Sequence, residues 1–137
     1  MSERAADPGT PDARGAREPL ELARLAARTA SSKQAEAIVI LDVRELITIT
    51  DYFVICSGSS DRQVKTIADD VVKGLKEAGA RPVRVEGESG ARWILVDYVD
   101  FVLHVFHEEE REFYRLENLW RDAPVVDWEE QAEARSG

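Results

Sequence analysis

The order of apolar patterns along the chain predicts a single compact α/β domain, in which helices pack against one mixed, five-stranded sheet. Five short runs are rich in β-branched and aromatic residues and have the length of strands. Longer segments between and after them repeat apolar residues at helical spacing. The resulting order is helix, two strands, helix, three strands and a final helix. At 137 residues the chain can build one core without disulfides or structural metal.

The first half of the chain begins with residues 1–17, which contain no apolar face, so we expect a disordered arm there. Residues 18–34 carry leucines and alanines at helical spacing and predict the first, amphipathic helix. Residues 35–42 include four consecutive aliphatics, which indicate a strand buried on both faces. Residues 52–57 (YFVICS) predict the second strand.

The second helix is the most clearly delimited element. Ser60, followed three residues later by Gln63, matches a capping box in which the hydroxyl accepts from the Gln63 amide. An apolar stripe then continues to Ala78, and Gly79 stands where a helix stops. This pattern predicts a helix of about 18 residues, roughly 27 Å long.

The second half begins with a short strand at residues 81–86, placed at a sheet edge because Pro82 cannot donate a ladder hydrogen bond. A loop at 87–90 leads into a β-hairpin at 92–107. Residues 108–120 predict a last helix or pair of short helices, with three glutamates at the start, where the helix dipole favours acids. We place the domain at residues 18–122 and expect a loosely ordered C-terminal extension at 123–137.

The hairpin carries the predicted functional surface. With a two-residue turn at Tyr98-Val99, Asp97 lies opposite Asp100, Val96 pairs with Phe101, and Trp93 pairs with His104. Alternation of side chains then gives one wholly apolar face, made of Ile94, Val96, Phe101, Leu103 and Val105. The other face mixes an aromatic ring, aliphatics, carboxylates and an imidazole: Trp93, Leu95, Asp97, Asp100, Val102 and His104. The first face predicts core, and the second predicts a partner-binding surface.

Composition narrows the possible partners. Residues 82–137 hold fourteen acids and six bases, so that half carries −8 of the net charge of −9. Binding to a phosphate backbone needs clustered Lys and Arg, so we expect little direct contact with nucleic acid and a basic protein partner instead. No apolar run reaches the ~18–20 residues of a membrane span, and the first 17 residues lack the apolar core of a secretory signal. We expect a cytoplasmic protein without membrane contact.

Three other patterns have competing interpretations. Gly58-Ser59, between a strand and a helix, could cradle a phosphate, but a well-capped helix explains it more simply. His104 and His107 lie three apart on a strand and so face opposite sides, which argues against one shared metal ion. Cys56 has no basic neighbour in the sequence and is interpreted as a buried, inert thiol. Trp93 is equally compatible with a ring covered by a helix and with an exposed anchor for a partner.

Several separated motifs resemble the ribosomal silencing factor family, also called the iojap family, over roughly residues 19–122. They are DYFVICSGSSDRQ at 51–63, Glu86-Gly87 before Trp93, Asp97-Tyr98 with Asp100, His104-Val105, Phe113-Tyr114, Leu116-Glu117 and Leu119-Trp120. Many members of that family have Gly where Val99 stands here.

The resemblance implies a translational repressor and not an enzyme. Members of the family bind the large ribosomal subunit through large-subunit ribosomal protein fourteen, block joining of the small subunit and lower translation when nutrients run short. Their fold is similar to nucleotidyltransferases without the catalytic metal site, which implies no catalytic residue, metal or cofactor here, and some members form homodimers. The partner-binding residues that we expect are those of the mixed hairpin face and its turn: Trp93, Leu95, Asp97, Tyr98, Asp100 and His104. A nucleotide-transferring enzyme and a homo-oligomeric scaffold remain the alternatives.

Overall fold

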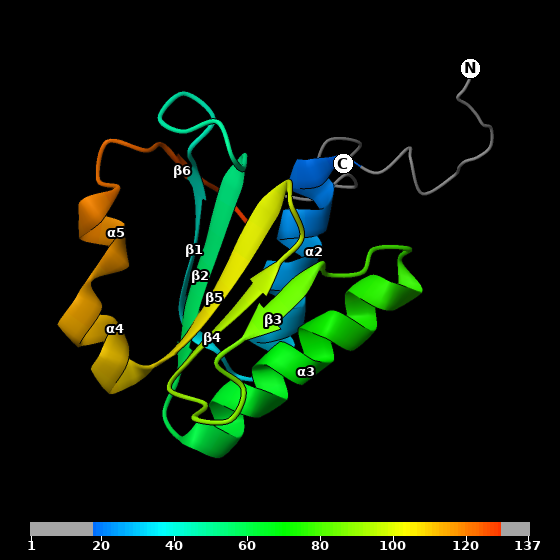
Figure 1. Ribbon diagram of the computed structural model, residues 1–137, viewed down its shortest axis with the longest axis vertical. Helices are drawn as coiled ribbons and strands as arrows, with labels where there is room; N and C mark the ends of the chain where they lie inside the picture. Colours follow the sequence, from blue (N-terminus) through cyan, green and yellow to red (C-terminus); the bar gives the residue numbers. More distant parts are fainter. Residues whose placement is uncertain (1–17, 130–137) are drawn as a thin grey trace.

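The computed structural model describes residues 18–129, which form one α/β layer structure (Figure 1). The predicted disordered arm lies outside the described residues. The elements in chain order are α2 (Pro19–Ser32), β1 (Glu36–Asp42), β2 (Tyr52–Gly58), α3 (Asp61–Glu77), β3 (Arg84–Glu86), β4 (Trp93–Asp97), β5 (Phe101–His107), α4 (Glu108–Tyr114), α5 (Leu116–Leu119) and β6 (Val125–Val126). No helix among these has the length and apolar character needed to cross a lipid bilayer.

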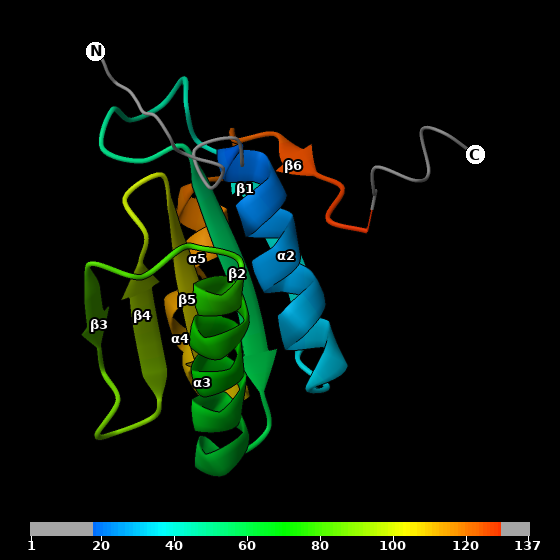
Figure 2. The ribbon, with the colours of Figure 1, turned by 90° about the vertical axis from the view of Figure 1, so that its right-hand side faces the viewer.

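The sheet has the order β3-β4-β5-β2-β1-β6, in which β2 and β5 run parallel and every other neighbouring pair is antiparallel. The predicted fold class is confirmed, although the sheet has six strands and not five. Helices α2 and α3 lie side by side on one face, and α4 and α5 cover the other (Figures 1 and 2). The strand β3 forms an edge, as Pro82 predicts.

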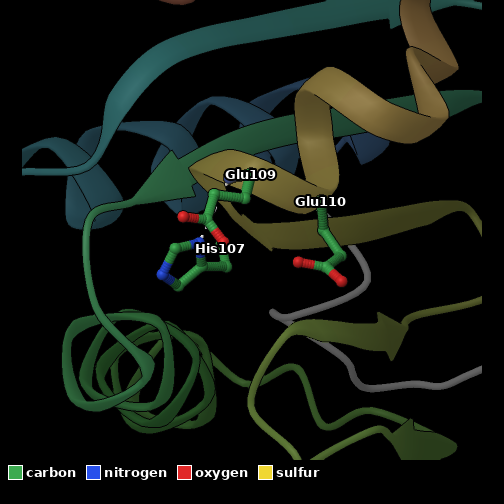
Figure 3. Close-up of side chains that lie close together, drawn as sticks. All are labelled: His107, Glu109 and Glu110. Carbon is green, nitrogen blue, oxygen red and sulfur yellow. Dashed lines mark hydrogen bonds between the residues drawn. The ribbon is translucent and has the colours of Figure 1, made fainter.

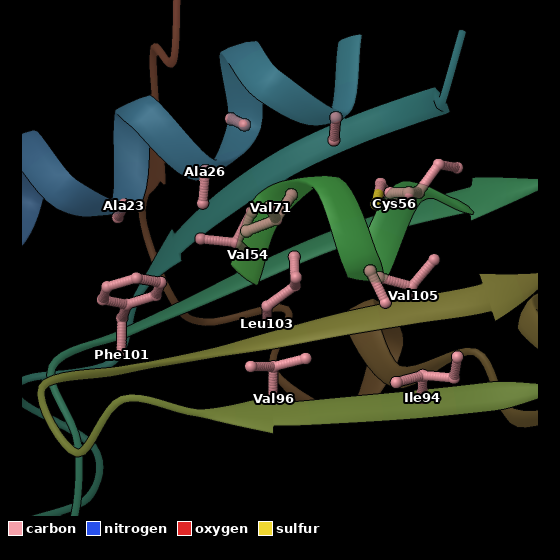
Figure 4. Close-up of a cluster of buried hydrophobic side chains, with 14 of the residues drawn as sticks. Ala23, Ala26, Val54, Cys56, Val71, Ile94, Val96, Phe101, Leu103 and Val105 are labelled. Atoms are coloured by element: carbon pink, nitrogen blue, oxygen red, sulfur yellow. The ribbon is translucent and has the colours of Figure 1, made fainter. Parts of the chain in front are cut away.

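The main core lies between the sheet and the pair α2 and α3 (Figure 4). The predicted apolar face of the hairpin points into it, since Ile94, Val96, Phe101, Leu103 and Val105 are all at most 1% exposed. On the α2 side the contact is made by small residues, because four alanines of α2 (Ala23, Ala26, Ala27 and Ala30) are fully buried. Short side chains let α2 pack close to the sheet, so the larger strand residues fill the space between the layers.

The start of α3 confirms the predicted cap. The Ser60 hydroxyl oxygen accepts a hydrogen bond from the Gln63 amide at 3.1 Å. The Gln63 side chain does not return to Ser60, as a full capping box would require. It accepts instead from the amide and the hydroxyl of Ser59, at 2.7 Å and 3.1 Å. The helix then runs for 17 residues, one fewer than predicted.

The hairpin register differs from the prediction by two positions. Val96 pairs with Leu103 and Trp93 pairs with Phe106, because the two-residue turn is Val99-Asp100 and the Tyr98 amide donates to the Phe101 carbonyl at 2.9 Å. The physical reason is the Tyr98 ring, which is only 8% exposed and stacks on Phe101 with 4.7 Å between ring centroids. Tyr98 therefore belongs to the strand end and not to the turn. A shift of two positions keeps every side chain on its predicted face.

The turn itself is strained at Val99. Its φ is 75°, and the Asp100 amide donates to the Tyr98 carbonyl at 2.9 Å, which closes a γ-turn around Val99. A β-branched residue is disfavoured with positive φ, whereas glycine adopts that region freely. We therefore expect Val99→Gly to raise the free energy of unfolding by about 1 kcal/mol, which urea denaturation would measure.

A matched control is available at Val83, which is 66% exposed and not among the positive-φ residues. There the same change should lower the free energy of unfolding by roughly 0.5–1 kcal/mol, because glycine only adds freedom to the unfolded chain. Equal losses from both substitutions would mean that the Val99 backbone carries no relievable strain.

The described part of the C-terminal extension is more ordered than predicted. Residues Val125–Val126 form β6 and pair with β1 at Leu41 and Ile40. The Trp128 indole N–H donates to the Ile38 carbonyl at 3.1 Å. Two valines are too short a run to indicate a strand, so sequence periodicity could not have found this sixth strand. Residues 130–137 lie outside the described part of the chain.

Candidate functional site

The mixed face of the hairpin points away from α2 and α3, toward α4 and α5, as the side-chain alternation predicts. Trp93 and Leu95 are half-buried on this face, together with Val102 of β5. Asp97 is also half-buried, and Asp100 at the turn is exposed. The structure thus brings Trp93, Leu95 and Asp97 together along one strand.

Two of the expected partner-binding residues are buried within the domain. Tyr98 points into the main core, where burial raises the pKa of its hydroxyl well above its ordinary value. His104 is 5% exposed and lies between Phe53 and Trp93, with ring centroids 5.1 Å and 6.0 Å away. The expectation that Tyr98 and His104 form a contact surface is therefore wrong: one side chain fills the core, and the other supports Trp93 from beneath.

His104 fixes the orientation of Trp93. The indole N–H donates to Nδ1 of His104 at 3.2 Å, so the neutral imidazole carries its proton on Nε2. That Nε2 atom is buried without a hydrogen-bond partner. Burial lowers the pKa of His104 from 6.5 to about 4, because a charged imidazole would lose its hydration there.

This environment makes stability depend on pH. Between about pH 6.5 and pH 4 the unfolded chain binds a proton at His104 that the folded chain excludes, so stability should fall as the pH is lowered through that window. The loss attributable to His104 is about 3 kcal/mol. Urea denaturation at a series of pH values should show a smaller loss over this range for His104→Gln than for the wild type. Parallel curves for the two proteins would contradict the prediction.

The Trp93 ring is partly covered by a helix and partly exposed, so each of the two interpretations of its sequence context holds in part. Its ring stacks on Phe106 at 4.8 Å and meets Tyr114 of α4 at 5.0 Å, so a helix covers part of it. Tyr114 in turn meets Phe113 edge-on at 5.0 Å. Tyr114 is 48% exposed and Phe113 is 78% exposed, so this row of rings leads from the buried His104 outward to solvent.

The sequence analysis did not predict Phe113 and Tyr114 as site residues. Leu116 and Trp120 do pack inward, against a second cluster of buried residues that is separate from the main core. The segment bends at Arg115, whose φ of 50° separates α4 from α5 and turns the Phe113 side outward. An adjacent pair of aromatics before the bend was the available signal. We call Trp93, Leu95, Asp97, Phe113 and Tyr114 the contact surface.

The carboxylates near this surface have partners within the domain. Asp97 Oδ2 lies 3.0 Å from the Arg84 guanidinium, and Asp97 Oδ1 accepts from the Val99 amide at 2.8 Å. Asp100 is exposed. Asp97 is thus an ion-paired carboxylate, whereas Glu108, Glu109 and Glu110 at the start of α4 outnumber the one arginine, Arg92, that binds two of them.

The Gly58-Ser59 turn is poorly arranged to hold a phosphate. Both donors of Ser59 are occupied by the Gln63 side chain, as described above. The turn also lies at the end of the sheet where β2 and β5 finish, because Gly58 pairs with His107. Asp97 lies at the opposite end, where it pairs with Val102 at the start of β5. The sheet therefore places no Asp97 carboxylate beside this turn to hold a catalytic metal ion.

One group of metal-ligating side chains does come together, at His107, Glu109 and Glu110 (Figure 3). Their donor atoms lie within 4.8 Å of one another. However, His107 Nδ1 already accepts from the Glu109 amide at 3.1 Å, and both carboxylates bind the Arg92 guanidinium. The group already serves as a helix cap and an ion-pair network.

Cys56 is fully buried in β2, and burial raises the pKa of its thiol to about 12. A thiol that stays protonated at neutral pH is a poor nucleophile. This agrees with its interpretation as an inert core residue.

Comparisons with known proteins agree on one family. The family model described as "Ribosomal silencing factor during starvation" matches residues 16–137. The ribosomal silencing factor RsfS of Halalkalibacterium halodurans is 45% identical over 109 residues, which cover 80% of this chain and 93% of the relative. Mouse mitochondrial assembly of ribosomal large subunit protein 1 is 36% identical over 91 residues, covering 64% of this chain and 40% of that protein. A crystal structure of a Chromobacterium violaceum protein superimposes with a TM-score of 0.75 at 33% identity, covering 85% of this chain and 96% of that one.

Proposed function

Since this chain belongs to the ribosomal silencing factor family, whose members regulate translation in association with the ribosome, we propose that it binds the large ribosomal subunit and blocks joining of the small subunit. The proposed docking partner is large-subunit ribosomal protein fourteen, and the proposed result is lower translation under nutrient limitation. The proposed place of action is the cytoplasm. The single observation that carries the proposal is the exposed row of apolar rings on the acidic half of a domain of this family.

The contact surface has the properties of a protein-binding site. Aromatic side chains supply most of the binding energy at such sites, and Phe113 and Tyr114 present large rings to solvent beside Trp93. Single exposed apolar residues are common, but a connected pair next to a half-buried tryptophan is a patch. The glutamates that open α4 add negative charge to the helix that carries this patch, which favours a basic partner and disfavours bare RNA.

The proposed role can be tested by sedimentation. We expect the purified protein to sediment with free large subunits and to reduce the fraction of joined ribosomes when small subunits are added. The effect should appear without added nucleotide, since the proposed mechanism is occupation of a surface and not catalysis. An unchanged fraction of joined ribosomes at saturating protein would contradict it.

The same experiment separates the alternatives. A nucleotide-transferring enzyme would require a nucleoside triphosphate for any effect, and three carboxylates at the same end of the sheet as the Gly58-Ser59 turn, those of Asp61, Glu109 and Glu110, are bound to the Arg92 guanidinium. A homo-oligomeric scaffold would give a stable dimer with no affinity for large subunits. A dimer that dissociates on large subunits would instead fit the proposed function, because some members of the family are expected to dimerise.

A further inference from the structure

The segment formed by α4 and α5 carries Phe113 and Tyr114 of the contact surface but contributes little to the buried core. Neither α4 nor α5 contains a buried residue. At its far end the segment is held by Trp120, which meets Phe53 edge-on at 5.4 Å between ring centroids. With so few apolar contacts, the position of α4 must depend on its polar contacts.

Arg92 provides several of these polar contacts. It immediately precedes β4, and its guanidinium lies 2.9 Å from a Glu109 oxygen and 2.8 Å from a Glu110 oxygen. The same guanidinium lies 3.3 Å from an oxygen of Asp61, the first residue of α3. The Arg92 carbonyl also accepts from the His107 amide at 2.8 Å. One residue thus joins β4, the end of β5 and the starts of two helices.

These contacts cross the end of the sheet. Helix α3 lies on one face and α4 on the other, so the Arg92 network links the two helical layers (Figure 1). Three carboxylates converge on one guanidinium and would repel one another without it. A single exposed ion pair contributes little to stability, but one cation shared by three acids offsets part of their mutual repulsion, which gives it a larger local effect.

We propose that Arg92 is a positioning residue: it holds α4 at the angle that places Tyr114 over Trp93 and Phe113 toward the partner. Arg92 does this through the carboxylates and does not itself touch the partner. The link to partner binding rests on the proposed function, whereas the link to the position of α4 does not.

The test uses the full chain and the substitution Arg92→Ala. Amide hydrogen exchange in residues 108–120 should become roughly tenfold faster, while exchange in the core of α3 stays unchanged. Affinity for purified large subunits should fall roughly fivefold, because the ordering of α4 would have to occur on binding. Arg62→Ala is the matched control: it removes the same charge from the exposed first turn of α3 and should change neither measurement.

Rescue distinguishes positioning from a simple loss of charge. Adding Glu109→Gln and Glu110→Gln to Arg92→Ala removes the repulsion and should restore most of the protection in residues 108–120. Unchanged exchange there in Arg92→Ala, or failure of this rescue, would overturn the proposal. Faster exchange with undiminished large-subunit binding would overturn the link to binding. If the wild type itself fails to bind large subunits, the proposed function fails, and the exchange data alone decide the role of Arg92.

Discussion

Replacing Leu103 with alanine should lower the free energy of unfolding by about 3–5 kcal/mol, the largest loss we expect from any single truncation discussed here. Leu103 is fully buried in β5, between Val54 of β2 and Val96 of β4. Both flanking strands are fixed by the sheet, so the structure cannot collapse into the space left by the missing isopropyl group. Urea denaturation of the two proteins would measure the difference.

The same chemical change at Leu119 is the control. Leu119 is 75% exposed in α5, so its truncation should cost under about 0.5 kcal/mol. Similar losses at the two positions would mean that β5 is not the centre of the core.

Truncation of Phe113 should have the largest effect on partner binding. Phe113→Ala should weaken binding to large subunits by about 2–4 kcal/mol, which is roughly 30-fold to 1000-fold, because an aromatic ring at the centre of an interface is lost. The melting temperature should change little, since the ring is 78% exposed. Sedimentation at a series of protein concentrations gives the affinity.

Ile49→Ala is the matched control for this experiment. Ile49 is apolar and 80% exposed, but it lies in the loop between β1 and β2 and is not part of the contact surface. We expect unchanged affinity and unchanged melting temperature. An equal loss of affinity at Ile49 and Phe113, or none at either, would contradict the position of the contact surface. Trp93→Ala is a poorer probe, because Trp93 also packs on Phe106 and should lose stability as well as binding.

The sequence predicted the faces of the hairpin but not its register. Side-chain alternation depends only on whether positions are odd or even, so the apolar face survived a turn displaced by one residue. The turn position depended on Tyr98, whose ring gains more from the core than the chain loses by forcing Val99 to positive φ. That balance involves contacts across the domain, which local turn preferences do not contain.

The candidate site was predicted only in part for the same reason. Periodicity placed Trp93 and His104 on one face, but it could not show that α4 folds back over that face. A polar imidazole on a strand reads as exposed, whereas here the indole N–H satisfies one nitrogen and rings surround the other. The outward direction of Phe113 depends on the bend at Arg115, a residue type with no special preference for positive φ.

The parallel pairing of β2 with β5 has a consequence for how the chain folds. It joins Tyr52 to Phe101, so the middle of the sheet can form only after a long loop has closed, whereas the β4–β5 hairpin is local. The hairpin should therefore form early in refolding and the central pair late. During synthesis from the N-terminus, β2 must wait with an unpaired edge until β5 has left the exit tunnel. The nascent domain is most prone to aggregation in that interval, when the most buried strand of the finished protein is still exposed.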